Sequence, residues 1–360
     1  MEFDLDKHTI YKTLTGSRAY GTFNDDSDYD YRGVCIPPER YWFGYASNFS
    51  QYDPKSEDVT IFGFSKFLHL AAQNNPNILE LLYVPEKFWQ VSSPYWEELV
   101  AHRDWFLSKK CMHTYKGYAH SQLRRMRNHR EWLIKGELNE PKREDFGLGE
   151  YRALPTETIN AAQALIQRHM NRFPLEEELS SLPKDVAMAI RQLVNEFLEH
   201  TVELTIQEIN NTSWISAGRV LGFDANLLEV LKKEKAYQSA IKEYASWKHW
   251  KAERNPRRRE SEEKIGFDCK HGMHLVRLLI TCREILTEGT IHVERTDAEE
   301  ILLPIKRGEW SYEKLMDWER QASSELDELY QQSTLQKDPK RKSIEELGIK
   351  ITKQFLSDHS

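Results

Sequence analysis

Alternating apolar and polar positions near the start of the chain predict β-strands. Residues 8–14 alternate in the manner of a strand, and the run ends at Gly16-Ser17, where the residue types favour a turn and a helix start. Residues 27–36 predict a second strand, which Pro37-Pro38 ends. Residues 58–64 are rich in β-branched and aromatic side chains and are expected to pair with it.

Helical spacing replaces this alternation further along the chain. Residues 65–74 show an amphipathic helical pattern, and the break at Asn75-Pro76-Asn77 starts another helix that continues through residues 80–83. The mixed pattern ends near Ser108, and helical patterns dominate from there. They cover residues 111–135, 156–171, 184–214, 225–250, 270–287 and 312–332.

These patterns predict an α+β protein with three parts. A mixed sheet with helices is expected at residues 1–108, and a mainly helical domain that completes the cleft at residues 109–335. The final residues, 336–360, are expected to be a loosely attached tail, despite a short helical pattern at 343–355. Charged or Pro- and Gly-containing stretches at 136–151 and 252–263 predict exposed connections.

Composition narrows the class of protein. Of 360 residues, 39% are hydrophobic and 30% charged, as is usual for soluble globular proteins, and no apolar run approaches the roughly 20 residues needed to cross a bilayer. The first seven residues carry three acidic side chains and lack the pattern of a secretion signal, so a cytoplasmic location is expected. Four scattered cysteines without a C-x-x-C pair predict reduced thiols rather than disulfides or a structural zinc site.

Two basic stretches stand out against a net charge of −7. Residues 109–130 and 248–259 each interleave Lys and Arg with aromatic side chains, a combination that suits stacking on bases and pairing with phosphates. Solvated helix faces are the alternative interpretation, because charge runs on helices are common. Both interpretations stay open at this point.

The second predicted strand carries two carboxylates in a pattern suited to a metal site. Side chains alternate across a strand, so Asp28 and Asp30 project from one face with Cα atoms about 6.5 to 7 Å apart. Two converging carboxylates suit magnesium, especially when triphosphate oxygens complete its shell. Asp58, on the neighbouring strand, is the best-placed third acid for a second ion.

A candidate phosphate-binding turn precedes these acids. Gly16 allows close backbone approach, and Ser17 at a helix start offers its hydroxyl and amide donors. Arg18 could add a cation to the same phosphates. Asp28 follows Ser17 by eleven positions, which is enough for the chain to return as a strand beside the turn. Each element alone is weak evidence, and the prediction rests on their order and spacing.

These motifs resemble the signature of predicted nucleotidyltransferases of the DNA polymerase beta superfamily. The match lies in Gly16-Ser17-Arg18-Ala19-Tyr20-Gly21, followed by Ser27-Asp28-Tyr29-Asp30-Tyr31-Arg32-Gly33-Val34. More narrowly, the chain resembles the RNA-repair-pathway DNA polymerase beta family. That resemblance extends to residues 75–82, 115–122, 271–279 and 284–295.

The resemblance implies a nucleotidyltransferase fold with a mixed sheet, an activity and site residues. It implies magnesium-dependent transfer of a nucleoside monophosphate from a nucleoside triphosphate (NTP), with release of pyrophosphate. Gly16 and Ser17 match the triphosphate-binding pair, and Asp28 and Asp30 match the ligands of two Mg²⁺ ions. The third acid carries over less securely: Asp58 begins a strand where such an acid is expected, whereas Glu80 lies in a family-like motif. We favour Asp58.

A motif in the C-terminal half adds further candidates. Lys270 and His274 lie at i, i+4 on a predicted helix, with Arg277 one turn beyond His274. They could contact the triphosphate or the acceptor, or they could pack the helical domain against the first domain. A zinc site there is disfavoured, because the motif contains no carboxylate in a ligand position.

The leading hypothesis is therefore an enzyme that adds a nucleotide to a hydroxyl group of RNA. Protein nucleotidylation of the AMPylation type uses the same chemistry and remains an alternative, as does a small-molecule acceptor. A non-catalytic nucleotide- or RNA-binding module is a further alternative, which the intact pair Asp28 and Asp30 argues against. No membrane partner is expected, and the sequence gives no indication of oligomeric state.

Overall fold

The computed structural model divides the chain differently from the predicted boundaries at residues 108 and 335. It describes residues 3–25, 27–45, 48–54, 56–152, 154–171, 186, 215, 218–219, 221–253 and 262–359. One compact unit combines Met1–Lys135 with Asn255–Ser360, and the other is Gly136–Arg254. The first unit joins the sheet and the long helices because they share one hydrophobic core.

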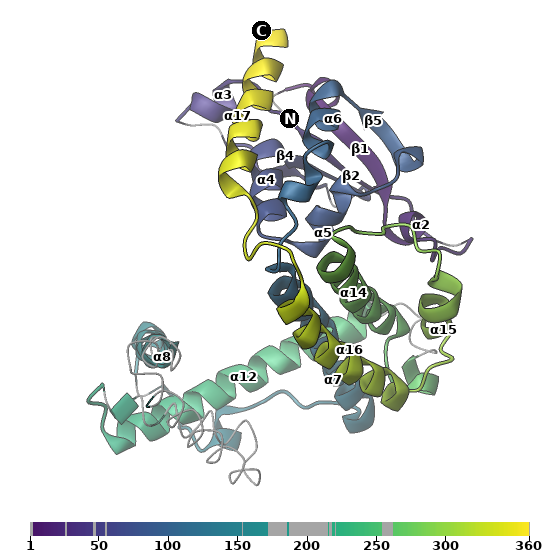
Figure 1. The fold of residues 1–360 in the computed structure, drawn as a ribbon. Coiled ribbons are helices and arrows are strands. Elements are labelled where there is room, and N and C mark those ends of the chain that lie inside the picture. Colours follow the sequence, from purple (N-terminus) through teal and green to yellow (C-terminus); the bar gives the residue numbers. More distant parts are fainter. Residues whose placement is uncertain are drawn as a thin grey trace. The chain divides into compact units, whose positions relative to one another are not determined.

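A five-stranded mixed sheet forms the N-terminal part of the first unit, as predicted (Figure 1). Its strands are β1 (Thr9–Thr15), β2 (Asp30–Cys35), β3 (Gln51–Tyr52), β4 (Val59–Gly63) and β5 (Trp89–Ser92), in the order β3-β4-β2-β1-β5. β2 runs parallel to β4, and the other neighbouring pairs are antiparallel. The predicted second strand was too long at its start, so Asp28 lies in the loop before β2.

Short helices connect and cover these strands. The α-helices are α1 (Leu5–His8), α2 (Gly16–Tyr20), α3 (Arg40–Phe43), α4 (Phe64–Ala72), α5 (Pro76–Leu79) and α6 (Pro94–Val100), and the 3₁₀ helices are η1 (Glu80–Leu82), η2 (Glu86–Phe88) and η3 (Arg103–Trp105). Tyr11 of β1 stacks on Trp96 of α6 with ring centroids 3.8 Å apart, and Phe67 of α4 meets the same indole edge-on. These aromatic contacts fix α4 and α6 against the sheet.

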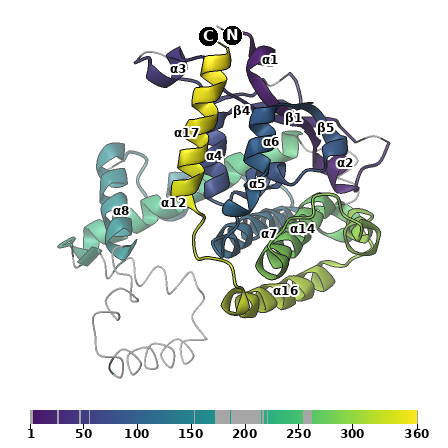
Figure 2. The same cartoon turned by 45° about the horizontal axis from the view of Figure 1, so that its top comes forward.

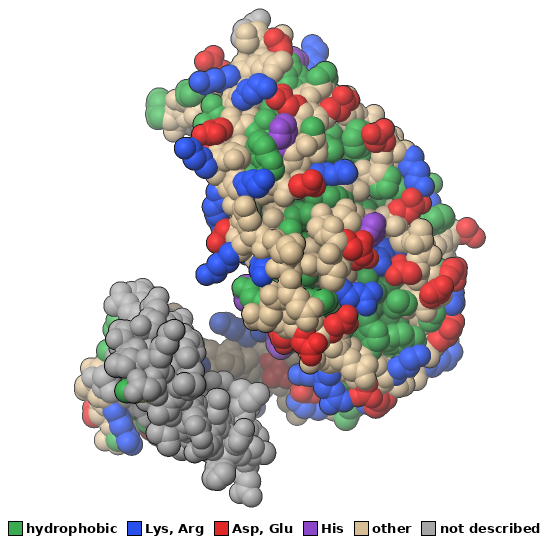
Figure 3. All heavy atoms as spheres, in the orientation of Figure 1, with side chains coloured by type: hydrophobic (Ala, Val, Ile, Leu, Met, Phe, Trp, Pro, Cys, Tyr) green, Lys and Arg blue, Asp and Glu red, His purple; other side chains and the backbone are tan. Residues whose placement is uncertain are grey.

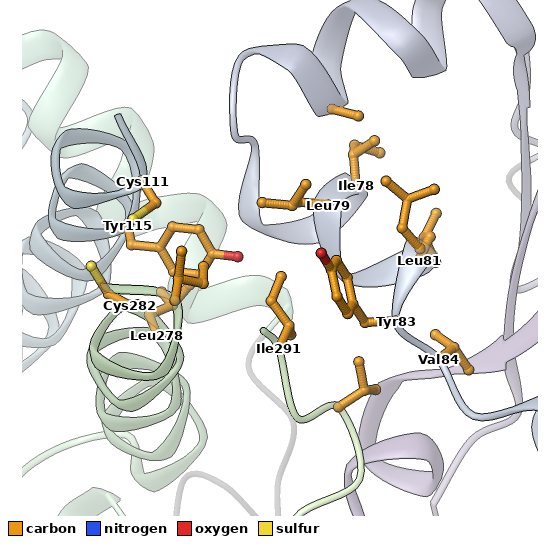
Figure 4. Packing of buried hydrophobic residues seen from close by; sticks show 14 of the residues in the cluster. Ile78, Leu79, Leu81, Tyr83, Val84, Cys111, Tyr115, Leu278, Cys282 and Ile291 are labelled. Carbon is orange, nitrogen blue, oxygen red and sulfur yellow. The ribbon is translucent and has the colours of Figure 1, made fainter. Parts of the chain in front are cut away.

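Long helices complete the same unit. α7 (Cys111–Lys135) lies beside α14 (Cys269–Glu288). α14 also packs against α16 (Tyr312–Gln332) and α15 (Leu303–Lys306), and the π-helix η5 (Ala298–Leu302) directly precedes α15. Figure 4 shows Cys111 and Tyr115 of α7 and Leu278 and Cys282 of α14 in the core that also contains Leu79. The first and last residues of α7 and α16 are those predicted.

The C-terminal residues are firmly packed, in contrast to the predicted loose tail. α17 (Arg341–Asp358) lies along α4 and α6, as both views show (Figures 1 and 2). Ile351 and Phe355 are fully buried. The short helical pattern at 343–355 thus belongs to a longer helix with one side in the core. Charged residues between the apolar positions made this helix look weakly attached in the sequence.

The second unit is helical in its described residues. η4 (Arg143–Phe146), α8 (Thr156–Asn171) and α12 (Ala225–Glu253) belong to it. The bounds of α8 agree with the prediction, and the predicted connection at 136–151 contains only η4. Arg143 donates to Glu234 at 2.6 Å, a partly buried ion pair that ties η4 to α12. The predicted helix at 184–214 lies outside the described residues except for residue 186, as does most of the predicted connection at 252–263.

All four cysteines are buried free thiols, which confirms the prediction that they are not paired. Burial raises the pKa of the Cys35 thiol to about 12. No helix among the described residues combines the length and apolar character needed to span a membrane.

Candidate active site

The register between β2 and β4 places two predicted acids side by side. Tyr31 pairs with Val59 in the parallel ladder, and the Tyr31 amide donates to the Asp58 carbonyl at 2.8 Å. Extending this register by one residue, toward the start of both strands, places Asp30 opposite Asp58. In-register residues of neighbouring strands, about 4.8 Å apart, direct their side chains to one face of the sheet. The two carboxylates therefore share a face at the start of both strands.

The turn after β1 packs directly on Asp30. Gly16 has φ 68°, a left-handed conformation that favours glycine, and a Cβ atom at this position would collide with Asp30 Oδ2. The Thr15 hydroxyl donates to the Asp30 carbonyl at 3.2 Å. Ser17 follows Gly16 in the first turn of α2, and its carbonyl accepts from the Thr22 amide at 2.9 Å. The predicted phosphate turn and the acids thus meet at one end of the sheet.

These groups border a pocket of about 220 Å³ with four carboxylates in its lining. Burial, and next the charge of Asp58, raise the pKa of Asp30, while Lys270 and Arg32 oppose that shift. The two acids repel each other in the protein alone. The negative charge of the four carboxylates in this lining suits a cation. Its lining residues are Thr15, Gly16, Tyr20, Asp30, Tyr31, Arg32, Asp53, Glu57, Asp58, Val59 and Thr60.

Asp28 lies in an exposed loop next to this pocket, and Arg18 holds that loop. The Arg18 guanidinium donates to the Ser27 carbonyl at 2.7 Å and to the Asp28 carbonyl at 3.3 Å. It also lies 3.7 Å from the centroid of the Tyr29 ring. These contacts support a positioning role for Arg18, whereas direct contact with a phosphate stays a prediction.

The start of α14 brings positive charge near Asp30 and also carries a neutral imidazole. Lys270 lies in the first turn of α14, and its charge partly offsets the rise in the pKa of Asp30. Arg277 Nη2 lies 3.1 Å from His274 Nδ1. A guanidinium can only donate, so Nδ1 accepts and the neutral ring carries its proton on Nε2. Burial, followed by the charge of Arg277, lowers the pKa of His274 to about 3.

A comparison with known protein families matches the N-terminal part of the chain. Residues 2–138 match the RNA repair pathway DNA polymerase beta family. The match contains the Gly16 turn, Asp30, Asp58 and α7, and it ends before the α14 residues.

A curated relative is similar to part of the chain. It is an uncharacterized 38.9 kDa protein in the nrdC-mobD intergenic region of Enterobacteria phage T4, 27% identical over 126 residues. The alignment covers 32% of this chain and 37% of the phage protein, so the similarity spans little more than a third of that relative. No solved structure matches the chain significantly.

Glu80, the alternative third acid of the family-like motif, is engaged in the core. It is 4% exposed, accepts from the Tyr20 hydroxyl at 2.7 Å, and accepts from Arg277 Nη1 at 2.9 Å. Arg277 also lies 3.9 Å from the centroid of the Tyr20 ring. Both Glu80 oxygens thus stabilise the packing of η1 against α2 and α14. The geometry favours Asp58, which lies in the pocket with Asp30.

Lys306 is a candidate that sequence reasoning missed. Its ammonium donates to the Thr22 carbonyl at 2.5 Å, just after α2. Burial, and then the charge of Lys270, lower its pKa, so the two lysines are near each other. A lone lysine in a helix distant along the chain gives no signal in the sequence. Sequence reasoning also missed Asp53 and Glu57 of the pocket, which lie close to Asp58 between β3 and β4 but match no motif.

Two cations of the first basic stretch form ion pairs with α16, and others are exposed. Lys116 pairs with Asp327 of α16 at 2.9 Å, and Arg130 lies 3.7 Å from Glu313. On the face seen in Figure 3, basic and acidic side chains are interspersed. Arg125 is exposed on α7, and its charge contributes to the lowered pKa of His274, so it lies on the side of α7 near α14. In the second stretch, residues 254–259 lie outside the described residues.

Proposed function

We propose that this protein is a magnesium-dependent nucleotidyltransferase that moves a nucleoside monophosphate from an NTP to a hydroxyl group of RNA and releases pyrophosphate. The observation that carries the proposal is the alignment of Asp30 with Asp58 beside the Gly16 turn. In the reaction, the acceptor oxygen bonds to the α-phosphorus as the bond to pyrophosphate breaks. The family match over residues 2–138 supports the same activity.

The donor groups of the pocket suit magnesium. Carboxylate oxygens are the ligands that Mg²⁺ prefers. Burial, and next the charge of Asp58, raise the pKa of Asp30, and a bound cation would favour its ionised form. Asp28, Asp30 and Asp58 would hold two ions. When bound, such ions activate the attacking hydroxyl and neutralise charge on the leaving pyrophosphate.

The chain's own groups account for binding of the triphosphate. Gly16 permits close backbone approach, and Ser17 offers an amide and a hydroxyl. Lys270 and Lys306 provide positive charge from α14 and α15. His274 would donate its Nε2 proton without adding charge, because its ring is neutral. Gly16, Ser17, Arg18, Lys270 and His274 are the proposed nucleotide-binding set.

Arg125 supports RNA as the acceptor. Arg125 is an exposed cation on α7 whose charge reaches His274, and it would pair with a backbone phosphate of an acceptor strand. Arg125→Ala should weaken use of an RNA acceptor and reduce its dependence on salt, while Arg320→Ala on the exposed side of α16 should change neither.

The test of the acceptor is transfer of label from each α-³²P nucleoside triphosphate in the presence of magnesium. Total RNA and a cell protein extract serve as separate acceptors, and EDTA reactions give the background. Label in RNA supports the proposal. Label in protein would reassign the acceptor to a protein hydroxyl, and no transfer with any triphosphate would favour a non-catalytic binding module.

Substitution of the acids tests the metal ligands. Asp30→Asn and Asp58→Asn should lower the rate of transfer by more than about 1,000-fold, equal to about 4 kcal/mol of transition-state stabilisation. Melting temperature should stay the same or rise, because each change removes carboxylate repulsion. Asp25→Asn, in the exposed loop before β2, is the matched control and should retain activity. Full magnesium-dependent activity in Asp30→Asn would refute the assignment.

A further inference from the structure

A second group of metal-ligating side chains lies at the junction of α7 and α14, separate from the acidic pocket. One potential ligand atom from each of His129, Asp268 and His271 lies within 4.8 Å of the others. Glu262, from the helical residues 262–265, brings its Oε1 to 3.9 Å from His129 Nδ1. The four side chains are between 3% and 21% exposed. The cluster is therefore largely buried and rich in ligands.

Neighbouring groups orient the two ligands contributed by α14. His271 Nδ1 lies 2.8 Å from Gln122 Oε1, and because an amide oxygen only accepts, Nδ1 carries the proton and Nε2 has the lone pair. Nε2 lies 3.7 Å from Asp268 Oδ2. Asp268 Oδ1 accepts from the Lys270 amide at 2.8 Å and the His271 amide at 3.3 Å, as the cap of α14. In metal centres, outer hydrogen bonds of this kind fix the tautomer and aim the ligand atoms.

We propose that His129, Glu262, Asp268 and His271 form a structural site for a divalent transition-metal ion of the zinc type. Two imidazole nitrogens and two carboxylate oxygens are suitable donors for tetrahedral zinc. The N···O separations of 3.7 and 3.9 Å are slightly longer than the roughly 3.4 Å expected between ligands with bonds of about 2.1 Å. On binding, the atoms of His129, Asp268 and His271 would move inward from separations of up to 4.8 Å, and the Glu262 carboxylate beside His129 would close the shell.

The position of this cluster gives the metal a function. A divalent ion would offset the charge of two buried carboxylates, which is otherwise costly to bury. It would also join α7 to the first turn of α14, where Asp268 is the cap and Lys270 follows. The site therefore fixes the helix end that presents Lys270 and His274. The sequence motif alone disfavoured zinc, because three of the four ligands, His129, Glu262 and Asp268, come from outside it.

The first measurement is the zinc content and zinc affinity of the full chain. We expect one zinc per chain after dialysis, by elemental analysis, and no displacement by excess magnesium. Loading with Co²⁺ should give intense visible bands typical of four-coordination. His129→Gln and His271→Gln should each weaken zinc affinity by at least about 100-fold, and Gln122→Ala by about 10- to 100-fold.

Two controls separate this site from other metal sites. His120→Gln, an exposed histidine on the same helix, and Asp30→Asn, in the acidic pocket, should bind zinc as the unchanged protein does. Zinc should raise the melting temperature of the unchanged protein. Absence of stoichiometric zinc, or unchanged affinity in both His129→Gln and His271→Gln, would overturn the proposal. If those variants do not fold, the Co²⁺ spectrum of the unchanged protein decides: bands of an all-oxygen octahedral ion would overturn it as well.

Discussion

Gly16 is constrained twice, by its backbone and by its neighbour. Its positive φ disfavours any side chain, and a Cβ atom would collide with the Asp30 carboxylate. Gly16→Ala should therefore lower stability by about 1 to 2 kcal/mol and displace Asp30. Transfer activity should be nearly lost.

Gly289→Ala separates the two effects. Gly289 has nearly the same φ, 66°, but a Cβ atom added there would have no atom of the described residues within 4 Å. This variant should lose similar stability in denaturant titration and keep full activity. Equal activity in both variants would show that the contact of Gly16 with Asp30 has no functional role.

His274 should make stability depend on pH. Its folded-state pKa of about 3 lies below the ordinary 6.5, with burial as the main cause and Arg277, His271, Lys270 and Arg125 as further causes. The unfolded chain binds the proton first as pH falls, so stability decreases below about pH 6.5. Between pH 7 and pH 5 the loss from this residue should be about 2 kcal/mol.

Urea titrations in EDTA at both pH values test this expectation. His274→Asn should show a correspondingly smaller loss of stability on acidification, and His120→Asn should behave as the unchanged protein does. The same loss in His274→Asn would show that His274 is not the responsible group.

At the scale of elements, one buried ion pair joins three of them. Glu80 of η1 and Arg277 of α14 are both under 10% exposed, and Tyr20 of α2 contacts both. Glu80→Gln leaves the Arg277 charge without its buried counter-charge and should cost about 3 kcal/mol or more. Glu80→Gln with Arg277→Met should recover part of that loss, as a double-mutant cycle would reveal.

The exposed pair Arg320 and Asp317 supplies the control, since Arg320→Met should leave stability close to that of the unchanged protein. If Glu80→Gln instead kept its stability and lost magnesium-dependent activity, Glu80 rather than Asp58 would be the third acid.

The same scale shows what local sequence patterns could predict. Long helices such as α7 and α16 were predicted with the correct ends because apolar periodicity continues over many turns. β3, with two residues, and β5, with one half-buried and three exposed residues, give little periodic signal. Their positions depend on pairing with β4 and β1.

The candidate site also contains residues that a local sequence pattern predicts and residues that only tertiary packing brings together. Gly16, Asp28, Asp30 and Asp58 lie within a short stretch of sequence whose order carries the motif. Lys306 and the cluster around His129 are assembled only by the packing of α7, α14 and α15. Such contacts between distant segments leave no local pattern in one sequence.

At the scale of the whole molecule, the second unit is inserted between two halves of the first. The first unit contains the chain before residue 136 and after residue 254, and the family match ends at residue 138. The described residues that flank the second unit on its two sides lie near each other in the first unit, because His129 lies beside Glu262 and Arg130 donates to the Gly266 carbonyl.

Replacing residues 136–254 with a Gly/Ser linker of about 20 residues should therefore leave the first unit folded, because such a linker spans roughly 25 Å. The shortened chain should show a single unfolding transition and bind NTP and magnesium as the full chain does, in calorimetry and titration. The same chain carrying Asp30→Asn is the control for specific binding. Loss of transfer to RNA with retained NTP binding would assign acceptor recognition to the second unit, whereas failure to fold would show that the two units are not independent.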